Sequence, residues 1–501
     1  MQSDSRARSL IGAAVFVLTC AWLGLMIAHR FSLTFDEGIY VDASRRILAG
    51  QVPYRDFFVV MGPGTFWLQA LALRLFGMTL AASRAILILD LAILATCVFW
   101  LVSRVRSVGY AAWIAAFVVI LETATPGITI PSHRWDSAAC ALVAITICAS
   151  ASNRLAILVT GCAAAFAAWI TPPVALVAVA ILIWLSLEQR TKTPLFLAGA
   201  AAVSIVCTAV LAIQGALRPM LHQLLWNGSH YAGANYLPYG TLFGRGYGQF
   251  FDGATLFEWP IRAIVVLGII LPILLPPVAI LCFPQWRKTA FLRLLFLGGI
   301  ALVISTFPRM DLPHLTYCAP VFYALLAILA ASIPLPKVRA AILIAATLLA
   351  AVYTFNAVVQ HSREISLETN IGTVRALPED LVLVRGIQSE IPRGTSLFVF
   401  PYLPIANFFT LSPNPTRYSY LQPGMMSDQD EAAALAELRR SPPARILYFD
   451  FPEKELLSIW PASNPARLRF RHLESYIAAN YHRVGAIDTS KRAFEVLEPN
   501  E

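Results

Sequence analysis

Long apolar runs follow one another along the first 360 residues, and they constrain the fold more than any other feature. A helix needs about 20 apolar residues to cross the hydrocarbon core of a bilayer, and runs of about 17–25 serve. The predicted spans are 10–29, 82–103, 108–123, 137–151, 155–170, a sixth from Pro173 to about 187, 195–214, 260–283, 291–306, 315–333 and 340–358. The sequence therefore predicts an α-helical polytopic membrane protein with about eleven transmembrane helices.

Lysine and arginine residues mark one side of these spans. Cytoplasmic loops of membrane proteins carry an excess of both residues. If the N-terminus is cytoplasmic, every basic junction falls on the cytoplasmic side. These junctions are Arg6/Arg8, Arg104/Arg106, Arg154, Arg190/Lys192, Arg287/Lys288 and Lys337/Arg339. The pattern predicts a cytoplasmic N-terminus and places the chain after residue 359 on the outer, periplasmic side.

The composition argues against other classes of protein. Charged residues make up 13% of the chain, whereas a soluble domain carries about 25%. A net charge of +9 can signal nucleic acid, but here the basic residues stand in small groups at the ends of apolar runs, where they meet lipid phosphates. We therefore expect membrane lipid and no nucleic acid as a partner. The eight cysteines lie in or beside apolar stretches without a CxxC pair, which indicates buried thiols rather than a disulfide or zinc framework.

The composition changes sharply after about residue 360. Short apolar strands are expected at 396–400 and 445–451, and amphipathic helices at 428–440 and 466–480. Pro378 followed by two acidic residues is typical of a helix start. The sequence predicts two parts, a transmembrane domain over 1–359 and a soluble periplasmic α/β domain over 360–501.

Four polar clusters lie in segments that this topology places on the outer face. Ionisable residues at membrane depth are costly, so they tend to be functional or paired. Carboxylates, guanidiniums and imidazoles at one interface suit a substrate whose anionic group is held at the lipid surface. The clusters are Asp36, Glu37, Tyr40, Tyr54 and Arg55 in the loop 30–64; His133, Arg134 and Asp136; the loop 215–259 with His222, Asn227, His230, Tyr231, Asn235, Tyr236, Tyr239 and Arg245; and Arg309, Asp311 and His314.

Each cluster also has a purely structural interpretation. Thr34-x-x-Glu37 fits a capping box, with Asp36 as a first-turn acid and Gly50 as the helix stop. The other ionisable groups fit solvated interfacial loops, and the tyrosines near 231–239 fit an aromatic belt. A metal site could be drawn from Asp36, Glu37, His133, Asp136 and His314, although no metal-specific spacing such as HExxH joins them.

The residues after the first span resemble those of a known family. Phe35-Asp36-Glu37 precedes an amphipathic helix, then come Pro53-Tyr54, an apolar segment ending Leu75-Phe76-Gly77, and Ser83-Arg84 at the next span. This order resembles the GT-C superfamily of polyprenyl-phosphate-sugar-dependent glycosyltransferases, nearest to the protein mannosyltransferase and aminoarabinose transferase type (glycosyltransferase family 39-like). The Arg-x-Asp-x-x-His pattern at 309–314 is similar to bacterial members, and the tail is similar to their periplasmic α/β domains. The resemblance covers roughly residues 10–330.

The resemblance implies a GT-C-like helical bundle with its active site at the outer interface of a bacterial inner membrane. It implies transfer of a hexose or pentose from a polyprenyl-phosphate donor to an acceptor hydroxyl, with inversion. The acceptor, whether glycan, lipid or protein, and the sugar stay open. The family's essential aspartate matches Asp36, and a second acid matches Asp136. Some members bind a divalent metal near these acids, so metal also stays open.

The residue types agree with this chemistry. A carboxylate can take the proton of the attacking hydroxyl, and Asp36 is the candidate base, with Glu37 orienting a sugar hydroxyl. A phosphate leaving group needs cationic stabilisation, which Arg134, Arg309 and His314 could supply. The expected catalytic residues are Asp36, Glu37 and Asp136, and the expected substrate-binding residues are Tyr40, Tyr54, Arg55, His133, Arg134, Arg309, Asp311 and His314. The alternative class is a transporter or flippase for an anionic lipid-linked substrate, but no internal repeat is evident and the charges gather at one interface.

Overall fold

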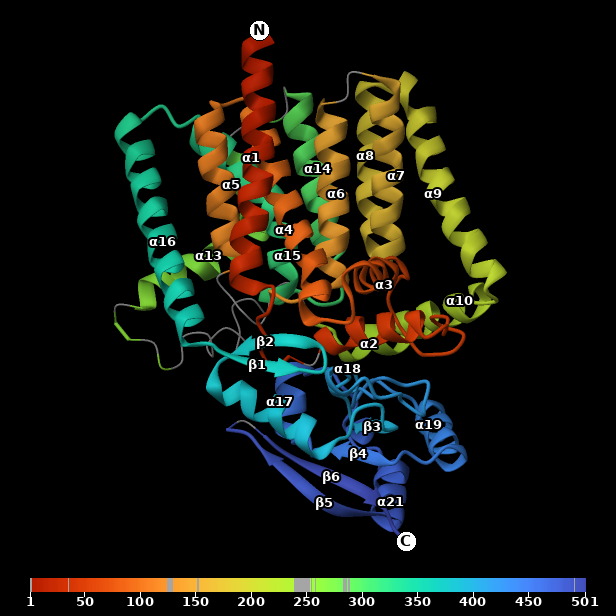
Figure 1. Ribbon diagram of the computed structural model, residues 1–501. Helices are drawn as coiled ribbons and strands as arrows, with labels where there is room; N and C mark the ends of the chain where they lie inside the picture. Colours follow the sequence, from red (N-terminus) through yellow and green to blue (C-terminus); the bar gives the residue numbers. More distant parts are fainter. Residues whose placement is uncertain are drawn as a thin grey trace.

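The structure is a computed structural model that describes residues 2–34, 36–123, 129–150, 153–237, 253, 255–256, 258–282, 286, 289–490 and 492–501. Phe35, Tyr239, Arg245, Arg287 and Lys288, which entered the sequence-based predictions, lie outside the described residues. Figure 1 shows two layers, a bundle of long helices and, beyond one end of it, a smaller domain with sheets that contains the C-terminus.

Each predicted span corresponds to a helix in the bundle. The helices are α1 (Gln2–Ile27), α4 (Leu80–Ser103), α5 (Val108–Thr123), α6 (His133–Ser150), α7 (Arg154–Ile170), α8 (Ala175–Glu188), α9 (Thr193–Ile213), α13 (Glu258–Cys282), α14 (Ala290–Ile304), α15 (Leu312–Ala330) and α16 (Pro336–Arg363). By length and composition, five helices among the described residues can cross a membrane, and other apolar helices are shorter. The chain is a multi-pass helical membrane protein, and the number of about eleven crossings stays a prediction.

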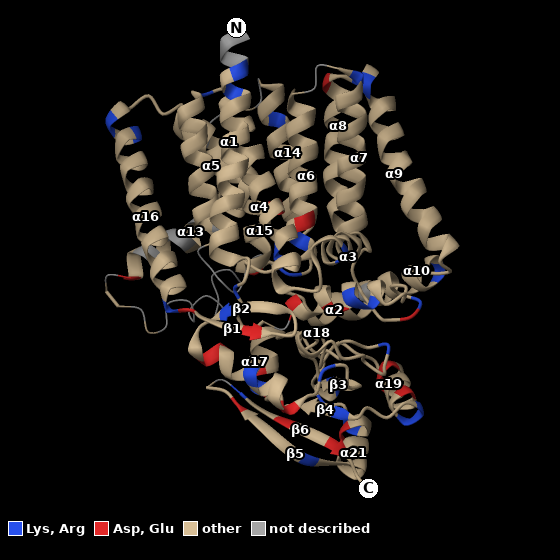
Figure 2. Ribbon diagram, viewed as in Figure 1, with Lys and Arg blue, Asp and Glu red and all other residues tan. Residues whose placement is uncertain are grey.

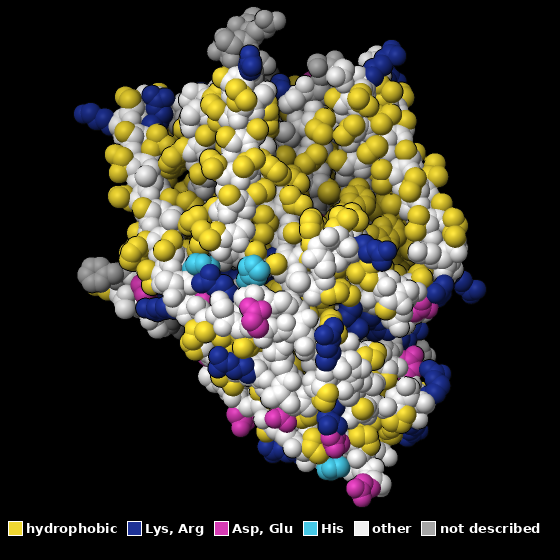
Figure 3. Space-filling view, viewed as in Figure 1, with side chains coloured by type: hydrophobic (Ala, Val, Ile, Leu, Met, Phe, Trp, Pro, Cys, Tyr) yellow, Lys and Arg dark blue, Asp and Glu magenta, His cyan; other side chains and the backbone are white. Residues whose placement is uncertain are grey.

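The surface of the bundle matches this class of protein. Apolar side chains cover the helices in the space-filling view, whereas charged side chains gather below them (Figure 3). Lys and Arg also lie at the end of the bundle opposite the C-terminal domain (Figure 2). Small residues let helices approach closely in a membrane. A Cβ added to Gly161 of α7 would lie 2.0 Å from the Phe196 carbonyl oxygen of α9, so this helix pair depends on glycine.

Three helices lie at the end of the bundle that faces the C-terminal domain. They are α2 (Glu37–Leu48), α3 (Gly64–Phe76) and α10 (Leu217–Trp226). The predicted stop of the first of them is confirmed, since α2 ends at Leu48 and Gly50 follows with φ of +88°. Figure 1 shows α2 between the bundle and the C-terminal domain.

The C-terminal domain has helices and strands, as the sequence predicts, and its strands form two sheets. Strands β1 (Ile365–Thr369) and β2 (Gly372–Ala376) form an antiparallel hairpin, and the larger sheet has the order β3-β4-β6-β5. Its β3–β4 pair is parallel, and its other pairs are antiparallel. The remaining elements are α17 (Pro378–Glu390), β3 (Leu397–Phe400), α18 (Ile405–Thr410), α19 (Asp428–Arg440), β4 (Arg445–Tyr448), α20 (Glu453–Ile459), α21 (Arg471–Asn480), β5 (Tyr481–Asp488) and β6 (Ala493–Pro499).

Two sequence-based boundaries in this domain need correction. The helix expected over 466–480 begins only at Arg471, because a 3₁₀ turn at Pro465–Arg467 precedes it. The strand expected over 445–451 ends at Tyr448.

The C-terminal domain shares one hydrophobic core with the loop 30–64, which is named the outer loop after the side of the membrane that the sequence predicts for it. Phe31, Val41 and Phe58 of the loop are buried in the same cluster as Phe398 and Phe408 of the domain. The link is also made by backbone hydrogen bonds. The Phe31 N–H donates to the Arg375 carbonyl (2.7 Å), and the Arg375 N–H donates to the His29 carbonyl (2.6 Å). The first outer loop is therefore held between two layers.

Candidate functional site

Asp36 lies at the N-cap position of α2, in the loop between the two layers. The residue is exposed to solvent, although many protein atoms lie around its carboxylate. Burial raises the pKa of Asp36, while the nearby charges of Arg309 and Arg134 lower it and that of Asp311 raises it. The described structure shows no capping hydrogen bond from this carboxylate, and its place at the N-terminus of α2 agrees with the interpretation of Asp36 as an acid beside the helix dipole. It is an accessible carboxylate that lies near two guanidinium groups.

The Arg309–His314 segment forms a fixed unit around one carboxylate. Asp311 caps α15 by accepting from the backbone N–H of His314 (3.2 Å). One of its oxygens contacts the His314 Nδ1 atom, and the other accepts from the Arg309 Nε–H. Burial opposes ionisation, but His314 and Arg309 outweigh it and hold the pKa of Asp311 below its usual range. Asp311 therefore orients the imidazole and the guanidinium.

Arg134 and His133 reach the same region from the first turn of α6. The His133 Nδ1 atom lies 2.7 Å from the Thr171 hydroxyl, and its ring centroid lies 6.1 Å from that of Tyr40. Arg134 is close enough to influence Asp36 and His314 electrostatically. The structure thus brings Asp36, Tyr40, His133, Arg134, Arg309, Asp311 and His314 together.

Tyrosines from both layers complete this cluster, and sequence reasoning missed most of them. Tyr317 of α15 lies near Asp36, Arg134 and Ser132. Tyr402 and Tyr420 come from the C-terminal domain and are buried, and burial together with the charge of Asp36 raises the pKa of both. Nothing in the sequence around these two tyrosines joins them to a loop more than 360 residues earlier.

Glu37 points away from this cluster and pairs with α4. The Arg84 guanidinium donates to the Glu37 Oε2 atom (2.8 Å) and to the Thr129 carbonyl (2.6 Å), and both side chains are almost fully buried. Burial raises the pKa of Glu37, and Arg84 lowers it. The capping-box interpretation of Glu37 is therefore wrong, and the residue instead joins α2 to α4.

Asp136 lies in the first turn of α6 but faces the helix bundle. It accepts a hydrogen bond from the Thr65 hydroxyl of α3 (2.5 Å) and lies beside Asp90 of α4. The expected role as second catalytic acid stays a prediction, while the geometry gives Asp136 contacts with α3 and α4.

Tyr54 and Arg55 also lie outside the cluster. Tyr54 has φ of +68° and is fully buried, and its hydroxyl donates to the Met61 carbonyl (2.5 Å). Arg55 is exposed and pairs with Asp56 (2.8 Å). These contacts show that both residues stabilise the conformation of the loop. Their expected contacts with substrate stay predictions.

Two of the candidate metal ligands have other partners in the described part of the chain, and metal binding stays an open prediction. Metal sites in proteins need several such side chains directed at one point. In the ranges that the structure describes, no three His, Cys, Asp or Glu side chains come together in this way. The five candidate metal ligands do not all share the same partners, since Glu37 pairs with Arg84 and Asp136 accepts a hydrogen bond from Thr65.

A cavity of about 350 Å³ opens beside Arg134 and His133. Its other walls are largely apolar and come from the outer loop, the turn after α7, α10 and the segment after α14. They comprise Val60, Met61, Thr171, Pro172, Pro173, Leu224, Gly228, Tyr231, Ala232, Phe307 and Pro308. A cavity with a cationic end and apolar walls suits an amphiphile with an anionic head.

No protein-family model and no curated protein sequence matches this chain. Its fold is similar to that of ArnT from Cupriavidus metallidurans bound to undecaprenyl phosphate, with a TM-score of 0.56 and 13% identity over 98% of this chain and 97% of that chain. It is also similar to the archaeal oligosaccharyltransferase AglB from Archaeoglobus fulgidus in complex with an inhibitory peptide and a dolichol-phosphate, with a TM-score of 0.50 and 12% identity over 87% of this chain and 69% of that chain. The chain therefore has the fold of the GT-C glycosyltransferases, and the resemblance stated from its first outer loop is confirmed at that level.

Proposed function

We propose that this protein is a membrane glycosyltransferase that moves a sugar from a polyprenyl-phosphate donor to an acceptor hydroxyl. The observation that carries the proposal is the position of Asp36, an accessible carboxylate near the charges of Arg134 and Arg309. The solved structures of similar fold hold undecaprenyl phosphate and dolichol-phosphate, which supports a lipid-phosphate donor here. We place the reaction at the outer face of a bacterial inner membrane.

Asp36 acts as the general base in this proposal. It takes the proton of the acceptor hydroxyl as the oxygen attacks the anomeric carbon, and the bond from that carbon to the phosphate oxygen breaks. The attack comes from the face opposite the phosphate, so the anomeric configuration inverts. The raised pKa of Asp36 makes the carboxylate a stronger base than an ordinary aspartate.

The phosphate leaving group departs toward Arg134 and Arg309. Its negative charge grows as the bond breaks, and preorganised guanidiniums stabilise such charge. Asp311 keeps Arg309 and His314 in place for this task. The polyprenyl tail follows the apolar walls of the 350 Å³ cavity toward the bilayer. Tyr40, Tyr317, Tyr402 and Tyr420 surround the sugar with aromatic faces and hydroxyls.

The first experiment compares wild type with Asp36→Asn. The protein is purified into lipid nanodiscs and given polyprenyl-phosphate hexoses and pentoses together with a membrane extract as acceptor. We expect wild type to consume one donor and to form a product of inverted configuration by NMR. Asp36→Asn should lose at least about a hundredfold in rate, because general-base catalysis supplies a factor of that size.

Asp56→Asn is the matched control, since it makes the same change in the same loop at a carboxylate paired with Arg55. It should keep its rate. Full activity of Asp36→Asn would assign the role of base to another group. If wild type consumed none of the sugar donors, the transferase proposal would be contradicted.

A further inference from the structure

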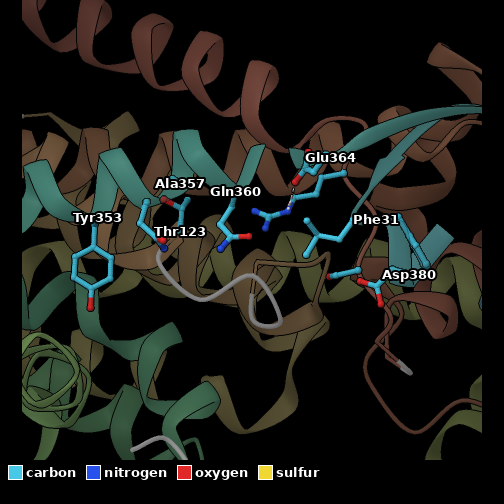
Figure 4. A pocket seen from close by; sticks show the side chains of 11 residues that line it. Phe31, Thr123, Tyr353, Ala357, Gln360, Glu364 and Asp380 are labelled. Carbon is cyan, nitrogen blue, oxygen red and sulfur yellow. Dashed lines mark ion pairs between the residues drawn. The ribbon is translucent and has the colours of Figure 1, made fainter. Parts of the chain in front are cut away.

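A second cavity, lined by several polar residues, lies at the outer end of α16, away from the cavity beside Arg134. It measures about 340 Å³ and lies where α16 meets the chain after α1 and the start of α17. Figure 4 shows Tyr353, Gln360 and Glu364 in order along α16, with Phe31 and Asp380 near the Glu364 end of the cavity. None of the residues that line this cavity has a role in the reaction proposed for Asp36, Arg134 and Arg309.

The side chains of this cavity suit hydroxyl groups. Asn356 and Gln360, one turn apart on α16, both line it. Asn356 is exposed and Gln360 is half-buried, and within the described part of the chain neither amide has a hydrogen-bond partner. An amide both donates and accepts, as a sugar hydroxyl does. The one arginine, Arg30, is already paired with Glu364 (3.0 Å), and Asp380 adds a second carboxylate. The cavity therefore has no spare cation for a phosphate, and it favours an uncharged polyhydroxyl group.

The bilayer gives access to this cavity. Helix α16 stands at the edge of the bundle in Figure 1, and only Leu349 of its described residues is buried. Apolar side chains such as Leu348 and Phe355 are exposed along it. A molecule anchored in the membrane by a lipid chain can therefore lie against α16 and place its head group in the cavity.

The position of the cavity relative to Asp36 gives its occupant a role. Ser32 lines the cavity, and the four residue steps from Ser32 to Asp36 span at most about 14 Å. This is the length of two to three sugar rings. In Figure 1, α16, α1 and α5 lie on one side of the bundle, and α7 and α10, which border the cavity beside Arg134, lie on the other. Inversion requires the acceptor to approach from the side opposite the phosphate.

We infer that the cavity at Asn356 and Gln360 is the subsite for the acceptor, a membrane-anchored carbohydrate that carries no phosphate at this point. The inference rests on the proposed function for the direction of transfer. The donor enters on the Arg134 side and the acceptor on the α16 side, and the two meet at Asp36.

The test compares the double variant Asn356→Ala/Gln360→Ala with wild type. Alanine favours helix, so α16 should fold in the variant. In the transfer assay, the KM for the acceptor should rise about tenfold through loss of two hydrogen bonds, with a smaller change in kcat. Ser362→Ala changes an exposed hydroxyl of the same helix that does not line the cavity, and it should keep the wild-type KM.

A binding experiment that needs no catalysis separates this inference from the proposed function. Nanodiscs containing the protein are irradiated with a diazirine-tagged alkyl glucoside or a diazirine-tagged phosphatidylglycerol, and labelled peptides are mapped. We expect the glucoside to label residues 353–364, plain alkyl glucoside to compete, and the double variant to lose the label. Equal labelling by phosphatidylglycerol, or no labelling of α16 by the glucoside, would overturn the inference. Donor turnover by wild type reports on the proposed function alone.

Discussion

Two opposing influences act on the pKa of Asp36. Burial raises it, and the charges of Arg309 and Arg134 lower it. A general base works only when it is deprotonated, so activity should fall as the pH drops through this pKa. Removing Arg309 should raise the pKa of Asp36 further, because one favourable charge is lost.

The predicted result for Arg309→Gln is an acid limb of the kcat/KM profile displaced to higher pH than in wild type. The plateau should also fall about a hundredfold, since a cation on the leaving phosphate is lost. Arg293→Gln is the control, because Arg293 pairs with Glu188 (2.6 Å) at the other end of the bundle. An unmoved acid limb, with the plateau lowered, would mean that the titrating group is not the carboxylate beside Arg309.

At the scale of single elements, a few contacts between helices hold the site in position. Helix α2 is joined to α4 by the buried Glu37–Arg84 ion pair and to α18 by close packing at Gly38, where an added Cβ would lie 2.1 Å from the Ile405 nitrogen. The Asp-Glu pair was visible in the sequence, and so was the helix that follows it. The partner of Glu37 was not, because Arg84 is 47 residues away and only the helix packing brings the two charges together.

Glu37→Ala should lower the free energy of unfolding by about 3–5 kcal/mol, because it leaves the Arg84 charge buried and unpaired. The double variant Glu37→Leu/Arg84→Met should recover most of that stability, since both charges are gone. Thermal and denaturant unfolding in detergent give these values, and the transfer assay is run on the same samples. If the double variant recovers both stability and activity, the ion pair has a purely structural role. If it recovers stability but not activity, the ion pair also positions α2. A single variant as stable as wild type would contradict the burial of the pair.

At the scale of the whole molecule, the sequence predicted the class of fold well and the relation of its two parts poorly. Apolar runs locate membrane helices because a bilayer imposes their length, so the bundle could be predicted. Local patterns also predicted α19 and the start of α17. The contributions of Tyr402 and Tyr420 to the site could not be predicted, because they depend on how a separate domain packs against the outer loop. The same limit applies to Asp136, whose neighbours Thr65 and Asp90 come from two other helices.

This packing predicts that the C-terminal domain is part of the catalytic unit. A chain ending at Arg363 would expose Phe31, Val41 and Phe58, which are buried in a core shared with the domain, and would lose both tyrosines. We expect the truncated protein to insert into membranes with its bundle intact, to lose at least about a hundredfold in transfer, and to become sensitive to protease in the loop 30–64. Circular dichroism, the transfer assay and limited proteolysis measure the three properties. A truncated protein that keeps its activity and a protected loop would mean that the outer loop holds its conformation without the domain, and the site would then belong to the membrane helices alone.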